Sequence, residues 1–163
     1  MHTRKLSPAF EMKENKIRPL VICIFSSNDR ILVAESVDPA TNELFYRPLG
    51  GAIKFGERSQ DALKREMREE LGEEIHNLTY LGMLENIFEY NQELGHEIVL
   101  VYDGEFVNRD LYDKEYLLGY EGEDENLYFK SLWKPINDFI MAHNPPLYPD
   151  GLIELLSQRK EGV

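Results

Sequence analysis

The sequence predicts an α/β fold in which a mixed β-sheet is covered by helices on both faces. Continuous apolar runs at 19–25 (PLVICIF) and 98–102 (IVLVY) are typical of strands buried on both sides. A helix is predicted over 60–71, between these runs, and an amphipathic helix over 151–159 near the C-terminus. Because each sheet face must be buried against another layer, helices before and after the later strands indicate a layered α/β domain.

Length and composition favour one globular domain. The chain has 163 residues with 42% hydrophobic content, enough for a sizeable core. Residues 1–18 are polar and mixed in charge, and we interpret them as an N-terminal arm before a domain at 19–163. The one cysteine, Cys23, lies in an apolar run and is expected to be a small buried side chain. A single cysteine fits a reducing compartment, so we expect a cytoplasmic protein, and no apolar run predicts a membrane span.

The net charge of −12 bears on the partner. Duplex nucleic acid requires clustered lysine and arginine, so the charge argues against it as a partner. A small phosphate ester is still compatible, because bound metal ions can supply positive charge locally.

The remaining elements follow from strand patterns and turn residues. A turn at 26–29 should join the first strand to a second at 31–34. A loop at 38–42 then leads through 44–47 to the glycine pair Gly50-Gly51. Further expected elements are strands around 78–81, 83–90 and 127–133, a hairpin loop at 91–95, a long acidic loop or lid over 108–126, and a short helix that starts at Pro135.

The helix over 60–71 has clear boundary signals. Ser59 is a favourable N-cap, Asp61 places negative charge in the first turn, and Gly72 stands where a C-cap glycine belongs. At about 100° per residue, Leu63, Met67 and Leu71 form one apolar stripe that should face the core.

A second face of this helix is acidic. Glu66, Glu69 and Glu70 are related by three and four residues and share this face, while Lys64, Arg65 and Arg68 are expected to lie away from it. Three carboxylates on one face repel each other unless a cation lies among them. Hard cations such as Mg²⁺ prefer oxygen ligands, so this face is a candidate metal site.

The stretch from Gly51 to Gly72 resembles the box of the Nudix hydrolases. The pattern has glycine, five residues, glutamate, seven residues, Arg-Glu, an apolar residue, any residue, Glu-Glu, any residue, glycine and an apolar residue. The matching residues are Gly51, Glu57, Arg65, Glu66, Met67, Glu69, Glu70 and Gly72. The last apolar position is Glu73 here, and Ile75 is expected to take over its packing role.

The resemblance implies the Nudix fold, an α/β/α sandwich with a mixed β-sheet. It also implies hydrolysis of a pyrophosphate bond in a nucleoside diphosphate linked to another moiety, with Mg²⁺ or Mn²⁺ as cofactor. Such cations neutralise phosphate charge and activate water. The residues implied at the metal are Gly50, Glu57, Glu66, Glu69 and Glu70.

The implied catalytic residues are Arg65, Glu66, Glu69 and Glu70, with Glu97 as a candidate base outside the box. A bidentate pair between Arg65 and Glu57 would fix the loop against the helix. The general base is either a box glutamate or Glu97. Glu97 could equally be an exposed carboxylate at a strand edge.

Substrate-binding candidates are few. Arg47 and Lys54 flank the glycines and could bind phosphate, or they could be surface charges. Tyr90 could stack on a base, or it could be a strand-packing residue. The expected partner is a small-molecule nucleotide, and a homodimer is possible because dimers are common in the family.

Two other functions fit the same resemblance. A retired Nudix domain could bind nucleotides as a sensor, but retirement usually removes box carboxylates, which are intact here. An isomerase on the same fold would need a catalytic cysteine outside the box, and Cys23 lies in a buried strand pattern.

Overall fold

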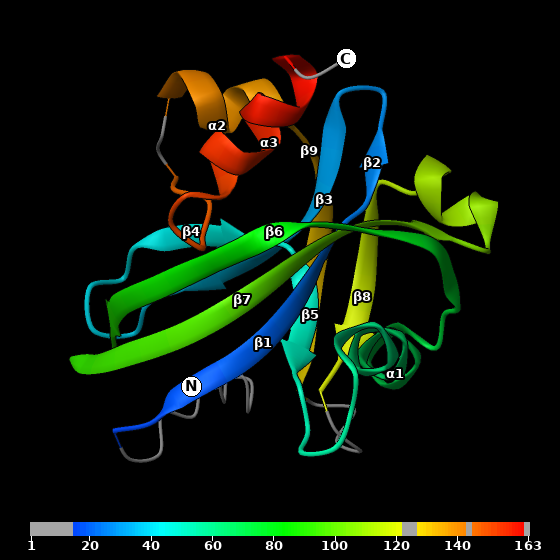
Figure 1. Cartoon of the computed structure of the whole chain (residues 1–163). Coiled ribbons are helices and arrows are strands. Elements are labelled where there is room, and N and C mark those ends of the chain that lie inside the picture. The colour runs from blue at the N-terminus through cyan, green and yellow to red at the C-terminus, as the bar shows by residue number, and fades with distance from the viewer. Residues whose placement is uncertain (1–14, 122–126, 143–144, 162–163) are drawn as a thin grey trace.

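The structure is a computed structural model that describes residues 15–121, 127–142 and 145–161. Its strands form two sheets (Figure 1). The first has the order β5-β1-β7-β6, and the second has the order β2-β3-β9-β8 with β4 paired to β3. The elements are β1 (Ile17–Ile24), β2 (Ser26–Ser27), β3 (Arg30–Val37), β4 (Leu44–Arg47), β5 (Leu49–Ala52), α1 (Ser59–Leu71), β6 (Ile75–Tyr90), β7 (Glu93–Phe106), the 3₁₀ helix η2 (Arg109–Asp113), β8 (Tyr116–Tyr120), β9 (Tyr128–Pro135), α2 (Ile136–Ala142) and α3 (Leu152–Glu161).

The first sheet is mixed, as the sequence predicts. β1 runs parallel to β7, from Ile17 opposite His96 to Ile24 opposite Asp103, whereas β5 and β6 run antiparallel to their neighbours. β1 is an inner strand of this sheet, and residues 20–25 are all buried. The prediction of a central strand at 19–25 is therefore confirmed. The strand begins at Ile17, inside the segment interpreted as an arm.

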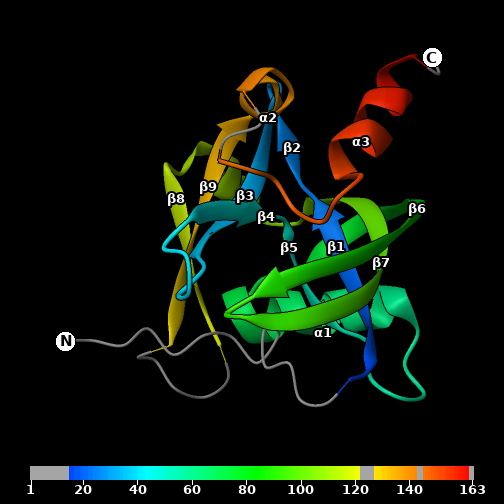
Figure 2. The ribbon, with the colours of Figure 1, turned by 90° about the vertical axis from the view of Figure 1, so that its left-hand side faces the viewer.

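Helices cover both faces of the strands, which confirms the α/β/α sandwich. Figure 1 shows α1 on one side and α2 with α3 on the other. One buried cluster joins Leu63 and Met67 of α1 to Val21 and Cys23 of β1. A second cluster joins Leu20 and Ile22, on the opposite face of β1, to α2 and α3. Figure 2 shows α2 above β9 and α3 beside β6, which are the strands they contact.

Several predicted boundaries are wrong because long-range pairing overrides local patterns. The two strands expected at 78–81 and 83–90 are one strand, β6, with register shifts near Tyr80. The hairpin loop is only Asn91 and Gln92, both with positive φ, which tightens the turn to two residues. Pro135 ends β9 rather than starting a helix.

The segment 108–126 is not one long loop in its described part. It contains η2 and β8, and β8 pairs antiparallel with β9. Residues 122–126 and 1–14 lie outside the described residues. None of the helices in the described ranges has the length and apolarity that crossing a membrane requires.

Candidate functional site

The glycine pair is required by two different close approaches. A Cβ at Gly50 would overlap the backbone of β1 at Val21, and a Cβ at Gly51 would overlap the carboxylate of Glu66. Gly50 therefore lets β5 pair closely with β1. Gly51 leaves room for a helix carboxylate to lie directly against the strand, which forms one wall of the site.

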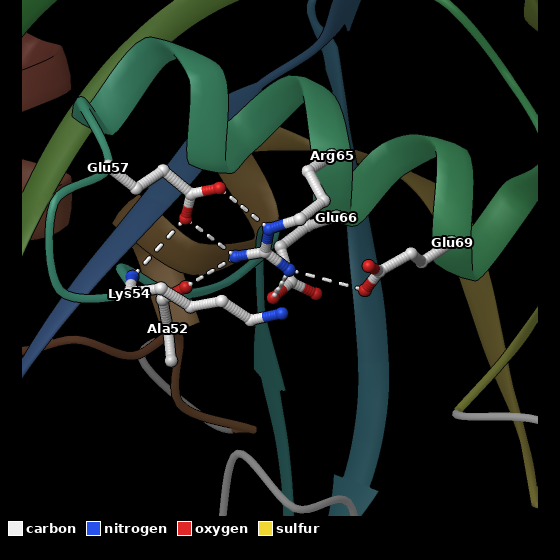
Figure 3. Close-up of polar contacts among 6 residues, drawn as sticks. All are labelled: Ala52, Lys54, Glu57, Arg65, Glu66 and Glu69. Atoms are coloured by element: carbon white, nitrogen blue, oxygen red, sulfur yellow. Dashed lines mark hydrogen bonds and ion pairs between the residues drawn. The ribbon is translucent and has the colours of Figure 1, made fainter.

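Arg65 lies at the centre of the site (Figure 3). Its Nε donates to Oε2 of Glu57 at 2.8 Å and its Nη2 to Oε1 of Glu57 at 2.9 Å, the bidentate pair that the sequence predicts. Nη2 also donates to the Ala52 carbonyl at 2.9 Å, so one guanidinium joins β5, the loop and α1. The Lys54 amide donates to Glu57 Oε1 at 3.2 Å. These bonds hold the loop 53–58 in one conformation.

The ion pair also determines the charge state of Glu57. Hydrogen bonds from Arg65 lower the pKa of Glu57 to about 2, so this carboxylate is ionised over the physiological range. The pKa of Arg65 is raised, first by the Glu57 hydrogen bonds and then by Glu66.

The structure corrects the expectation that Arg65 lies away from the acidic face. Its Nη1 donates to Glu66 at 2.9 Å and to Glu69 at 3.2 Å. The arginine therefore partly neutralises the face that carries the three carboxylates. Ser59 is also corrected: Arg58 is the N-cap without a side-chain cap bond, and the Ser59 hydroxyl instead lies 2.8 Å from the Tyr102 hydroxyl.

Glu66 and Glu70 are the less exposed carboxylates of the acidic face. Burial raises the pKa of Glu70 well above its ordinary value, and Glu66 and Glu121 raise it further by repulsion. Burial likewise raises the pKa of Glu66, although Arg65 opposes the change. Glu69 is exposed. Carboxylates this close disfavour full ionisation and gain from an added cation.

Glu121 is the site residue that the sequence analysis missed. It directly follows β8, which packs beside α1, and its charge reaches Glu70. The same charge reaches Tyr90 at the end of β6 and contributes to the raised pKa of that phenol. A strand pattern at 116–120 was the available signal, but only the pairing of β8 with β9 brings its end to α1.

The residues present fit a divalent cation by chemistry. Glu66, Glu69, Glu70 and Glu121 supply only oxygen donors, as Mg²⁺ and Mn²⁺ prefer. The room that Gly51 leaves against Glu66, and the repulsion that raises the pKa of Glu70, are the features expected where a cation binds. Within the described ranges, no three His, Cys, Asp or Glu side chains already surround one point. Glu66 and Glu69 instead turn to Arg65.

Glu97 is on β7 and does not belong to this helix face. This strand is an inner one, and the Glu97 side chain is 1% exposed, which overturns the alternative of an exposed strand-edge carboxylate. Its Oε2 lies 3.5 Å from Nη2 of Arg47 and 3.4 Å from Nδ2 of Asn86. Arg47 is therefore not a plain surface charge, since its side chain is 12% exposed and paired.

Tyr90 and Lys54 have different surroundings. Tyr90 is buried at the end of β6 and makes an edge contact with Phe45, whose ring also contacts Tyr148. Phe45 and Arg47 are two residues apart on β4, and Asn86 and Tyr90 are four residues apart on β6, so these two strands connect the aromatic cluster with the Arg47–Glu97 pair. Lys54 is exposed on the loop that Arg65 fixes.

Comparison with known proteins identifies the class. The family model of the NUDIX domain matches residues 16–150, which include both the acidic face and the Arg47–Glu97 pair. The chain belongs to the Nudix family.

Curated relatives match part of the chain. The NAD-capped RNA hydrolase NudC of Pseudomonas aeruginosa is 29% identical over 100 residues, which cover 61% of this chain and 33% of that protein. NudC of Pseudomonas putida is 37% identical over 67 residues, which cover 41% of this chain and 24% of that protein. The matches thus span at most about a third of the length of these relatives.

Solved structures share the fold over most of the chain. A NUDIX hydrolase from Nitrosomonas europaea has a TM-score of 0.62 at 17% identity, with 90% of each chain covered. A MutT NUDIX hydrolase from Burkholderia pseudomallei has a TM-score of 0.61 at 21% identity, and the match covers 87% of this chain and 98% of that one.

Proposed function

We propose that the protein hydrolyses a pyrophosphate bond in a nucleoside diphosphate linked to another moiety, with Mg²⁺ or Mn²⁺ as cofactor. The observation that carries the proposal is the acidic face of Glu66, Glu69 and Glu70, where burial and the repulsion of Glu66 and Glu121 raise the pKa of Glu70. This face lies beside a loop that Arg65 holds in place. Such a site can accommodate the two negative phosphates of a pyrophosphate only with added positive charge.

The cation would be held by Glu66, Glu69 and Glu70, together with Glu121 and the backbone of Gly50. When bound, it supplies positive charge for the phosphates and favours ionisation of water. We assign Glu57 to the loop anchor rather than to the cation, because both of its oxygens already accept hydrogen bonds from Arg65. Arg65 keeps the glycine strand and α1 in register, which positions the carboxylates.

A carboxylate must also accept a proton from the attacking water. A box glutamate fits this task, because the raised pKa values of Glu66 and Glu70 make these carboxylates stronger proton acceptors. Glu121 supplies a further carboxylate beside Glu70.

We assign the substrate phosphate contacts to Arg47 and Lys54. Tyr90 is 4% exposed and packs against Phe45, as the strand-packing alternative expects.

The substrate class is proposed from the relatives and the charge. NudC acts on NAD-capped RNA, as its name states. The NAD cap contains a nucleoside diphosphate linked to a second group. We therefore place NADH and NAD-capped RNA beside ADP-ribose and dinucleoside polyphosphates as candidates. Duplex nucleic acid stays disfavoured by the net charge of −12.

The test is product release from this panel and from nucleoside triphosphates, with Mg²⁺ and with Mn²⁺. Wild type is compared with Glu69→Gln and with the control Glu74→Gln, an exposed glutamate that pairs with Arg68 beyond the helix. We expect cation-dependent turnover of one substrate group, lost in Glu69→Gln and kept in Glu74→Gln. Nucleotide binding without turnover of any substrate would instead support the sensor function.

The isomerase alternative finds no support at Cys23. The thiol is fully buried, and burial raises its pKa well above the ordinary value, which opposes formation of a thiolate.

A further inference from the structure

The burial of Glu97 is energetically unfavourable. Its side chain is among the largest fully buried ones, and it is on β7, which lies between β1 and β6 in the sheet. Removing a carboxylate from water is unfavourable unless hydrogen bonds and an opposite charge offset the loss. The contacts of Glu97 should therefore be close and complete if the residue only stabilised the fold.

Those contacts are instead long and incomplete. Oε2 lies 3.5 Å from Arg47 and 3.4 Å from Asn86, whereas the Arg65–Glu57 distances are 2.8 and 2.9 Å. The second oxygen, Oε1, is buried and accepts no hydrogen bond from a described residue. A buried polar atom of this kind requires an explanation beyond stability.

The pair is positioned beside the acidic site. Arg47 ends β4 and is followed at once by Pro48, Leu49 and the glycine pair whose second member touches Glu66. On β6, the charge of Glu121 contributes to the raised pKa of Tyr90, and it does the same at Glu70 on α1. Tyr90 on β6 and Glu70 on α1 therefore both lie within electrostatic reach of Glu121.

Asn86 fixes the orientation of the Glu97 carboxylate. Its Nδ2 lies 3.4 Å from Glu97 Oε2, and its Oδ1 accepts from the amide of Asp150 at 3.4 Å. The second contact ties the cluster to the segment before α3. Glu97 is therefore held from β6, while Arg47 reaches it from a different sheet.

We infer that Glu97 is a positioning residue that directs the guanidinium of Arg47 toward a phosphate oxygen of the substrate. This inference rests on the proposed function, since the phosphate belongs to the same nucleotide. The guanidinium of Arg47 is a planar fork of N–H donors suited to phosphate, and Glu97 contacts it at Nη2. Glu97 is then not the proton acceptor for water, because Arg47 and Asn86 engage its carboxylate inside the fold.

The test is a double-mutant cycle on binding. Dissociation constants of ADP, GDP and adenosine are measured by calorimetry for wild type, Glu97→Gln, Arg47→Gln and the double variant, with thermal unfolding as the check on folding. We expect either single change to raise the dissociation constants of ADP and GDP roughly tenfold. The double variant should bind these nucleotides no more weakly than Arg47→Gln alone. Adenosine, which lacks phosphate, should bind all four proteins equally.

A second arm separates positioning from proton transfer. If Glu97 were the general base, Glu97→Gln would lower kcat by about 10²–10⁴-fold and remove the acidic limb of the pH profile. We expect a raised KM, a kcat within about threefold of wild type and an unchanged pH profile, and partial recovery of KM in Glu97→Asp. If Glu97→Gln does not fold, Glu97→Asp and Arg47→Lys replace it in the cycle.

The outcomes are distinguishable. The inference would be overturned if the two substitutions had additive effects on binding, or if adenosine binding weakened as much as ADP binding. It would also be overturned if the wild-type protein bound neither ADP nor GDP. Failure of the hydrolysis panel with an intact binding cycle would overturn the proposed reaction and keep the role of Glu97.

Discussion

Two arginine–glutamate pairs lie near each other in this protein and are built in opposite ways. Arg65 and Glu57 meet at 2.8 and 2.9 Å in a partly exposed loop, with the Ala52 carbonyl as a third contact. Arg47 and Glu97 meet at 3.5 Å around a fully buried carboxylate. The close pair is complete without a ligand, whereas the Glu97 carboxylate is fully buried with long contacts to one oxygen and none from a described residue to the other. We interpret the first as scaffold and the second as part of the binding surface.

The largest expected effect concerns the buried pair. Glu97→Leu alone should lower the free energy of unfolding by roughly 3 kcal/mol, because it leaves the Arg47 guanidinium partly buried without its carboxylate. Joint replacement by Arg47→Met and Glu97→Leu should return stability to within about 1 kcal/mol of wild type. Urea unfolding measures both. A joint variant as unstable as the single one would show that the pair is held for stability.

The next effect concerns the close pair. Arg65→Lys cannot keep the bidentate contact with Glu57, so the loop and α1 lose their register. We expect kcat to fall about hundredfold, as small misplacements of catalytic groups do. Arg68→Lys is the matched control, because Arg68 is on the same helix but is 53% exposed and pairs only with Glu74 among the described contacts. An equal fall of kcat in Arg65→Lys and Arg68→Lys would contradict the special role of the Arg65–Glu57 pair.

The contrast between the pairs also explains what the sequence could predict. The Arg65–Glu57 pair joins residues eight apart within the Nudix-like stretch, and the resemblance to that box implied it. Arg47 and Glu97 are fifty residues apart and meet only because β4 and β7 belong to different sheets that approach each other. Glu97 was thus selected as a candidate base, but no local pattern indicated its burial or its partner.

The same reasoning applies to the fold. The continuous apolar run at 19–25 and the periodic stripe of Leu63 and Met67 are both local signals, and the strand and helix they predict are confirmed. The acidic appearance of 108–126 concealed β8, since its alternation of exposed and buried residues becomes clear only once β9 pairs with it. Glu121 was missed for this reason.

Glu70→Gln is expected to have a smaller effect on Tm. The variant should be more stable than wild type without a divalent cation and should lose this advantage when the cation is added. Without divalent cations, Glu70→Gln should raise Tm by about 2–4 °C, since it removes the cost of about 1 kcal/mol of burying an ionisable group beside Glu66 and Glu121. A raised pKa in the folded state means that the folded protein holds the extra proton. Wild-type stability should therefore fall as pH rises through that raised pKa, and the variant should lose this dependence.

Addition of Mg²⁺ or Mn²⁺ should raise the Tm of wild type and have less effect on Glu70→Gln. Differential scanning calorimetry with and without a chelator measures both parts. A variant that is destabilised without cation, or stabilised by cation as much as wild type, would contradict the assignment of Glu70.

The smallest effect is expected at Lys54. Its backbone makes the contacts with Glu57, so Lys54→Ala should change the free energy of unfolding by less than about 0.5 kcal/mol. If the ammonium contacts phosphate, KM should rise about threefold, as for one exposed charge contact. Steady-state kinetics beside urea unfolding tests the point, and a loss of stability with unchanged KM would place Lys54 in the scaffold.

The division between scaffold and binding surface can be observed directly by NMR of the arginine Nε–H groups. Signals of Arg65 and Arg47 are assigned with Arg65→Lys and Arg47→Lys, and ADP is titrated into the wild-type protein in the presence of Mg²⁺. We predict that the Arg47 signal shifts with ligand while the Arg65 signal, already fixed by Glu57, stays in place. A shift of Arg65 with an unchanged Arg47 would contradict the roles assigned to the two pairs.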